Sequence, residues 1–123
     1  CFLGSMVAMP DGIINEIGLT FEKSGPISKE EAKKIVQECT YKLLKTVNDH
    51  ASLKSFLDVF PFTSSNIEIV IFAVDSDGKN FYHPTLNTIY SSKGKIYYMT
   101  LDEIKKNQYH ETIVEDMENI EHK

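Results

Sequence analysis

The side chains with the clearest potential for metal chemistry follow an apolar run in the middle of the chain. Asp75, Asp77 and Asn80 carry oxygen atoms and are grouped around Gly78. Ca²⁺ prefers such clustered oxygen ligands, but an EF-hand loop also needs a glutamate at its twelfth position, which Leu86 occupies when the loop is counted from Asp75. The same Asp-x-Asp-Gly order is typical of a tight hairpin turn. The sequence therefore favours a turn, and it predicts neither a metal site nor a cofactor.

The histidines give little support to catalysis. His50, His83, His110 and His122 are the four histidines, and the chain has no nucleophile elbow, no metal-binding histidine pair on a helix and no glycine-rich phosphate loop. His83 precedes Pro84 at the end of a predicted strand, where a polar cap is favoured over a metal ligand. The sequence therefore predicts a protein that is not an enzyme, and no catalytic residue is assigned.

Aromatic and apolar side chains indicate a binding face. Tyrosine presents a flat apolar ring with a polar tip, which suits binding surfaces and also ordinary sheet packing, the favoured interpretation. The predicted strand Ile67–Val74 is apolar on both faces, so one face is left for a second covering layer or for a partner. The candidate binding face consists of Val70, Phe72, Val74, Tyr82, His83, Tyr97 and Tyr98.

Strands in the second half of the chain must position these side chains. Dense β-branched and aromatic residues predict a strand at Ile67–Val74, a turn at residues 75–78 and a returning strand at residues 79–83. The strand resumes at residues 86–90, and Lys95–Leu101 forms a further strand after a second turn. Alternating apolar residues between positions 17 and 21 add an early strand. The sequence thus predicts an antiparallel meander of three to four strands.

Helical patterns flank these strands. Ser28 and Glu31 form a capping box, with Ile27 placed to pack on Ala32, and these residues predict the start of a long helix. Its apolar positions share about a third of the helical circumference: Ala32, Ile35, Val36, Cys39, Leu43 and Val47. A shorter helix is predicted at residues 51–60, and helical spacing between residues 110 and 120 predicts a C-terminal helix. The predicted fold class is therefore α+β, with a long N-terminal helix and a short helix packed on the antiparallel sheet.

Composition narrows the class of partner. The chain has 123 residues, which predicts a single α+β domain over residues 11–123. All 13 basic residues are lysine and the net charge is −5, so the arginine that usually contacts phosphates and base edges is absent. We therefore expect no nucleic acid, and expect a protein partner or a second copy of the chain on the second sheet face. No apolar run reaches membrane length.

The first ten residues predict an exported protein. Residues 1–10 grade from apolar to small, like the end of an export signal with a cleavage point near Ala8, and we expect a secreted or periplasmic protein. Cleavage there would leave Cys39 as the lone cysteine, so no internal disulfide could form. Two alternatives remain open. Cys1 could be the lipidated first residue of a lipoprotein, which is the one membrane association expected, or residues 4–6 could be left over from cloning.

Two resemblances to known proteins follow from the middle of the chain. Residues 69–84, with their strand, Asp-x-Asp-Gly turn and His83-Pro84 exit, resemble single Cache-type extracytoplasmic sensor domains, which also begin with a long and a short helix. That resemblance implies a small-ligand pocket between sheet and helix, near Tyr82 and His83. The capped helix, residues 60–63, residues 66–69, the hairpin and residues 94–98 are similar to small uncharacterised exported proteins of host-associated bacteria. The sequence hypothesis is a small exported binding module that acts through protein contacts, and the alternative is a Cache-like ligand sensor.

Overall fold

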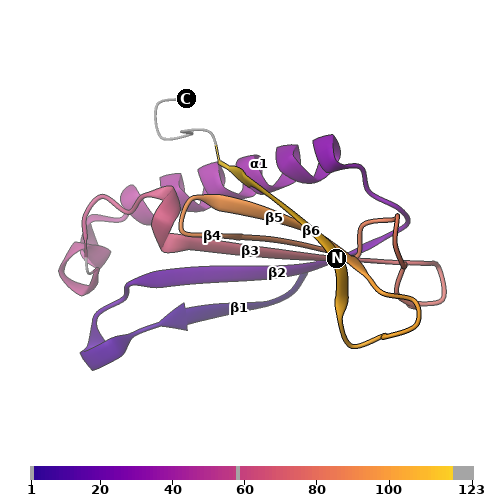
Figure 1. The fold of residues 1–123 in the computed structure, drawn as a ribbon. Coiled ribbons are helices and arrows are strands. Elements are labelled where there is room, and N and C mark those ends of the chain that lie inside the picture. The colour runs from indigo at the N-terminus through magenta and orange to yellow at the C-terminus, as the bar shows by residue number, and fades with distance from the viewer. Residues whose placement is uncertain (1, 58, 118–123) are drawn as a thin grey trace.

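The computed structural model describes residues 2–57 and 59–117, and Figure 1 shows their arrangement. One long helix and six strands make up the regular structure. In chain order these are β1 (Phe2–Ala8), β2 (Glu16–Ser24), α1 (Lys29–Asn48), β3 (Ile67–Val74), β4 (Thr88–Ser92), β5 (Lys95–Leu101) and β6 (Tyr109–Asp116). Three short 3-10 helices, η1 (Pro10–Gly12), η2 (Ala51–Phe56) and η3 (Ser64–Asn66), lie in the connections.

The strands lie in the sheet in the same order as in the chain, from β1 at one edge to β6 at the other. Every neighbouring pair is antiparallel except β2 and β3, which are parallel. Parallel neighbours need a long crossover connection, and α1 is part of the connection between β2 and β3. Because of that crossover, α1 runs along one face of the sheet, as Figure 1 shows.

The start of α1 is fixed by the predicted cap. The backbone N–H of Glu31 donates to the Ser28 hydroxyl over 3.0 Å, and Ser28 itself is extended, as an N-cap residue is expected to be. Ile27 and Ala32 are both buried at this end. The predicted capped helix is therefore confirmed, and it ends at Asn48.

The core lies between α1 and the face of the sheet that α1 covers. Ile67, Ile69 and Ile71 of β3 are almost fully buried in the same cluster as Ala32 and Val36 of α1. Neighbouring strands extend this layer through Ile89, Ile96 and Tyr98. Since side chains alternate between the faces of a strand, the residues between these positions face away from α1.

The predicted sheet is wrong in size and in kind. It has six strands in a mixed order rather than three to four in an antiparallel meander. β1 and β6 account for the extra width, because β1 pairs with β2 and β6 pairs with β5. The early strand was expected, and the structure places it as β2.

The predicted C-terminal helix is also wrong. Residues 109–116 form strand β6, and residues 118–120 of that prediction lie outside the described residues. The helical spacing of His110, Ile113 and Val114 competed with a run of β-branched side chains, Thr112 to Val114, which favours a strand. Pairing with the full length of β5 decides in favour of the strand.

Two shorter elements also differ from the prediction. The turn at residues 75–78 forms, and Gly78 has the positive φ of 77° that the turn needs. The returning strand expected at residues 79–83 is instead a loop, which pairs with β3 only through an isolated bridge between Val74 and Asn80, and β4 begins at Thr88. The short helix predicted at residues 51–60 is the 3-10 helix η2, which ends at Phe56.

Candidate functional site

The face of the sheet that points away from α1 carries an apolar and aromatic cluster. We call this cluster the open face and define it by Val70, Phe72, Tyr90, Tyr97 and Met99. Strand register brings these side chains together, because Val70 pairs with Tyr90 and Tyr90 pairs with Tyr97, while Phe72 and Met99 both pair with Thr88. All five are half-buried. Among the described residues the one α-helix packs on the opposite face, so no α-helix covers this cluster.

The open face has a defined geometry at its centre. The rings of Tyr90 and Tyr97 lie 5.7 Å apart at an angle of 36°, which is the tilted arrangement that aromatic pairs prefer. Val114 on β6 pairs with Tyr97 and is 48% exposed, so the apolar surface continues to that edge. A sheet face of this kind offers a partner flat rings and no deep hole.

Two carboxylates border one end of the open face. Gly18 pairs with Glu68 across β2 and β3, and Glu16 lies on the same face of β2. Burial raises the pKa of Glu68, and the nearby charge of Glu16 raises this pKa further, while a hydrogen bond with Tyr90 opposes the shift. Lys93 lies 3.5 Å from Glu16 and is itself 72% exposed. This end of the face therefore holds two carboxylates and one exposed lysine, so a further cation would be stabilised there.

The residues predicted for the binding face fall in four different places. Val70, Phe72 and Tyr97 lie on the open face, but Val74 is buried at the end of β3. Tyr98 belongs to the opposite face and is only 1% exposed. Tyr82 and His83 lie in the loop between β3 and β4. Tyr90 and Met99 were missed, and the signal that could have found them is the alternation of β4 and β5 once their register is known.

Tyr98 joins the sheet to α1 instead of serving the open face. Its hydroxyl donates to Glu115 over 2.7 Å, and Glu115 lies 3.2 Å from the ammonium of Lys29 and 3.5 Å from that of Lys33. Burial and the Glu115 carboxylate raise the pKa of Tyr98 well above its usual value. The Tyr98 hydrogen bond is also the main cause that lowers the pKa of Glu115, and the two lysines add to it. The network ties β5 and β6 to the first turns of α1.

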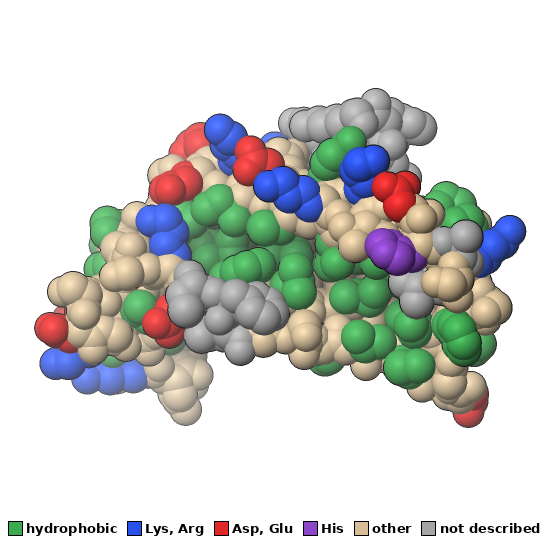
Figure 2. All heavy atoms as spheres, turned by 180° about the vertical axis from the view of Figure 1, so that it is seen from behind, with side chains coloured by type: hydrophobic (Ala, Val, Ile, Leu, Met, Phe, Trp, Pro, Cys, Tyr) green, Lys and Arg blue, Asp and Glu red, His purple; other side chains and the backbone are tan. Residues whose placement is uncertain are grey.

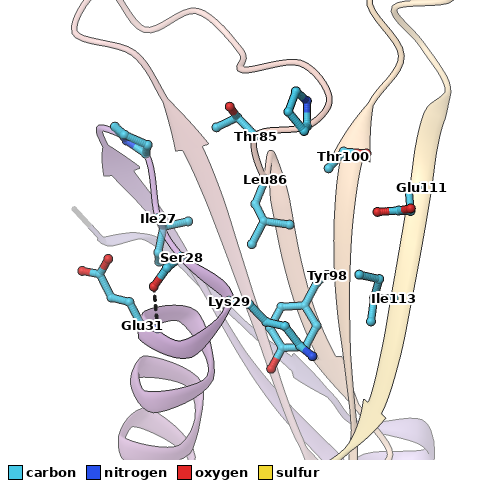
Figure 3. A pocket seen from close by; sticks show the side chains of 12 residues that line it. Ile27, Ser28, Lys29, Glu31, Thr85, Leu86, Tyr98, Thr100, Glu111 and Ile113 are labelled. Atoms are coloured by element: carbon cyan, nitrogen blue, oxygen red, sulfur yellow. Dashed lines mark hydrogen bonds between the residues drawn. The ribbon is translucent and has the colours of Figure 1, made fainter.

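A cavity of about 650 Å³ opens beside this network, between the start of α1, the loop at residues 84–86, and β5 and β6. Figure 3 shows Leu86 pointing into it, with Tyr98 and Lys29 below Leu86 and Ile113 beside Tyr98, its partner across β5 and β6. Its polar side chains include Lys29 and Glu111. Neither Tyr82 nor His83 lines it, so the structure separates this cavity from the residues that the Cache resemblance implied.

His83 takes part in a second, smaller cluster. The rings of His83 and His110 lie 3.9 Å apart, His83 Nδ1 is 2.9 Å from the Thr100 hydroxyl, and His110 Nδ1 is 3.4 Å from a carboxylate oxygen of Asp102. Backbone N–H groups of Lys105 and Ile104 donate to Asp102 and lower its pKa. Within the described residues, no group of three or more histidine, cysteine or acidic side chains is arranged to hold a metal ion.

The Asp75 carboxylate of the central turn is bonded within the turn itself. One carboxylate oxygen of Asp75 accepts the backbone N–H groups of Asp77 and Lys79, both over 2.9 Å. The N–H of Gly78 donates to the Asp75 carbonyl over 3.0 Å. Such bonds from an aspartate to the amides that follow it are what stabilise a turn, so the structure supports the turn interpretation of this sequence.

None of the helices in the described part of the chain has the length and apolar character needed to cross a membrane. No protein-family model, no curated protein and no solved structure matches the chain.

Proposed function

We propose that this protein is a non-enzymatic binding module whose open face takes an apolar segment of another protein that also carries a basic side chain. The observation that carries the proposal is the half-buried cluster of Val70, Phe72, Tyr90, Tyr97 and Met99, over which no α-helix packs among the described residues. Contiguous apolar surface of this kind on a folded protein marks interaction sites, and tyrosine is enriched where binding energy concentrates.

Charge defines the chemistry of the partner. The apolar centre of the open face ends at Glu16 and Glu68, and the chain as a whole has a net charge of −5. Since Glu68 is held in a half-buried site beside another carboxylate, a lysine or arginine from a partner would relieve their repulsion. An apolar segment flanked by one basic residue fits both parts of this surface.

A displayed library of random peptides, selected against the intact protein, tests the proposal. We expect the selected peptides to combine apolar or aromatic residues with lysine or arginine. Phe72→Glu should weaken their binding at least tenfold, since it buries a charge at the centre of the face. Glu68→Gln should weaken the binding of only those peptides that carry a basic residue.

Ile104→Glu provides the control, because Ile104 is 92% exposed in the loop before β6 and lies off the open face. This variant should bind the peptides like the unmodified protein. Selected peptides without the combined apolar and basic character, or undiminished binding by a folded Phe72→Glu variant, would remove the basis of the proposal.

An exported setting is also part of the proposal, on the composition of residues 1–10 alone. Cleavage near Ala8 would remove β1, whereas a lipidated Cys1 would keep it. Mass spectrometry of the protein from its native source tests this part, since it identifies the first residue and any lipid on Cys1. An unprocessed longer chain recovered from the cytoplasm would argue against export.

The cavity beside Tyr98 supports a second candidate, a sensor of small molecules. Lys29 and Glu111 offer opposite charges beside apolar Leu86 and Ile113, a combination that suits a small zwitterion such as an amino acid. A ligand that binds only the native state must raise its stability. A thermal-shift screen of amino acids and small organic acids should then show stabilisation that Ile113→Trp abolishes by filling the cavity. A flat screen would leave this candidate without support.

A further inference from the structure

Strand β1 forms one edge of the sheet, and its outer side is unpaired within the described residues. In an edge strand, alternate residues direct their backbone N–H and C=O groups away from the sheet. A row of free donors and acceptors of this kind is a template for another strand. The regular part of β1 runs from Gly4 to Ala8, because a bulge interrupts the register between Phe2 and Gly4.

The edge at β1 lacks the charges and prolines that usually prevent such pairing. The sequence of β1, Phe-Leu-Gly-Ser-Met-Val-Ala, contains no charged residue and no proline. Met6 and Val7 are 49% and 47% exposed on its two faces. The opposite edge, β6, differs, since it carries Glu111, Glu115 and Asp116 among its eight residues. Native proteins commonly protect edge strands with charges, so β6 is protected and β1 is not.

Electrostatics favours β1 over β6 as the edge at which two copies of the chain meet. Two copies of the chain, each with a net charge of −5, repel one another, and pairing through β6 would bring carboxylates of both copies together. Pairing through β1 brings no charged side chains of the two strands into contact. The uncharged strand is thus the edge at which two acidic copies can approach.

The side chains of β1 are also complementary to a second copy of themselves. Antiparallel pairing centred on Ser5 sets Met6 of each copy opposite Gly4 of the other. A Cβ atom added at Gly4 would have no neighbour within 4 Å, so the long Met6 side chain of a second copy has space there. Such a contact is isologous, because each copy uses the same surface, and it closes after two copies.

We infer that two copies of this chain associate through β1, which pairs antiparallel with β1 of the second copy and joins both sheets into one. This surface is separate from the open face, so the inference does not rest on the proposed binding of an apolar segment. It concerns the chain that keeps β1, as a lipidated Cys1 would leave it, because cleavage near Ala8 would remove the strand. A two-fold axis through such a strand pair is perpendicular to the sheet, and both copies of α1 therefore lie on the same face.

The dimer also gives a role to a hollow beside α1. Figure 2 shows hydrophobic side chains gathered in a hollow below the row of charged side chains that follows α1. Partly buried apolar residues of β2 and α1 pack against the core: Ile17, Leu19 and Phe21 from the strand, and Ile35, Cys39 and Leu43 from the helix. In the dimer the two hollows meet across the paired β1 strands and form one apolar trough between the two helices.

Light scattering after size exclusion tests the inference on the full chain. We expect the unmodified protein to have twice the mass of a single chain at high concentration and to dissociate on dilution. Val7→Lys should give the single-chain mass, because a lysine on a strand edge opposes pairing with another strand. Val114→Lys is the matched control, since Val114 is equally exposed, at 48%, but lies on β6. It should keep the double mass.

Amide hydrogen exchange of the unmodified protein gives a second measurement that needs no variant. Exchange at residues 4–8 should slow severalfold as the protein concentration rises, while exchange in β6 stays constant. A single-chain mass at every concentration would overturn the inference. So would dissociation by Val114→Lys but not Val7→Lys, or a series of growing species stopped by both variants, which would indicate head-to-tail pairing of β1 with β6.

Discussion

Glu68 and Glu115 show how the same residue type acquires opposite properties in one sheet. Glu68 lies beside Glu16 and is partly desolvated, so its pKa is raised. Glu115 accepts a hydrogen bond from Tyr98 and faces two lysines, so its pKa is lowered. No local pattern distinguishes them in the sequence. The difference arises from strand pairing, because Glu16 and Glu68 meet only when β2 and β3 are parallel neighbours.

Glu68→Gln should make the protein more stable at neutral pH. The raised pKa means that the folded state binds the proton more tightly than the unfolded state does. The contribution of Glu68 to stability is therefore fully present below the ordinary glutamate pKa of about 4.3 and is lost as the pH rises through the raised value. Urea unfolding at several pH values should give the variant a higher free energy of unfolding than the unmodified protein at pH 7 and an equal one at pH 4. A variant that is less stable at pH 7 would contradict this account.

Glu115→Gln should have the opposite effect. The charged form of Glu115 is stabilised in the folded state, so its contribution is present above about pH 4.3 and is lost as the pH falls through the lowered pKa. We expect the free energy of unfolding of the variant to be lower by up to about 1 kcal/mol at pH 7, the usual limit for exposed ion pairs. The loss should be smaller at high salt, because salt screens the ion pairs. The same urea series measures this loss. Equal stability of both proteins at pH 7 and low salt would show that the Lys29 and Lys33 contacts contribute nothing.

Helices and strands were predictable from the sequence where neighbouring residues alone determine them. The cap at Ser28 and the apolar density of Ile67–Val74 gave the right helix start and strand because neighbouring residues alone set them. β6 was missed because its partner, β5, is what makes residues 109–116 extended. The open face was foreseen in part for the same reason. Alternation within β3 identified Val70 and Phe72, whereas Tyr90 depends on a register that the sequence does not display.

Ser28→Ala should weaken the fold through α1. The Ser28 hydroxyl accepts the Glu31 N–H at the first turn, and removing an N-cap side chain of this kind costs about 1 kcal/mol. Thermal unfolding followed by circular dichroism at 222 nm measures the loss. Ser76→Ala is the control, because Ser76 lies exposed in the turn after β3, and it should leave the midpoint unchanged. If both variants unfold at the temperature of the unmodified protein, the cap contributes nothing to stability.

At the scale of the whole molecule, the two faces of the sheet have different energetic roles. The face toward α1 is a closed core, and Ile67, Ile69 and Ile71 are at most 1% exposed. The residues of the open face are only half-buried. A small α+β protein with one helix layer keeps its stability in the covered face, so residues on the other face are available for a partner at little cost to folding.

Substitutions at two adjacent residues of β3 therefore separate folding from binding. Ile69→Ala should cost about 2–5 kcal/mol, since it opens a cavity in a fully buried layer, whereas Val70→Ala should cost less than about 1.5 kcal/mol. Denaturant unfolding of both variants measures the two losses. When each variant is assayed in its folded state, only Val70→Ala should weaken the binding of the selected peptides to the open face. Equal losses of stability would mean that the Val70 side is covered as fully as the Ile69 side, and a surface covered in that way would leave no room for a partner.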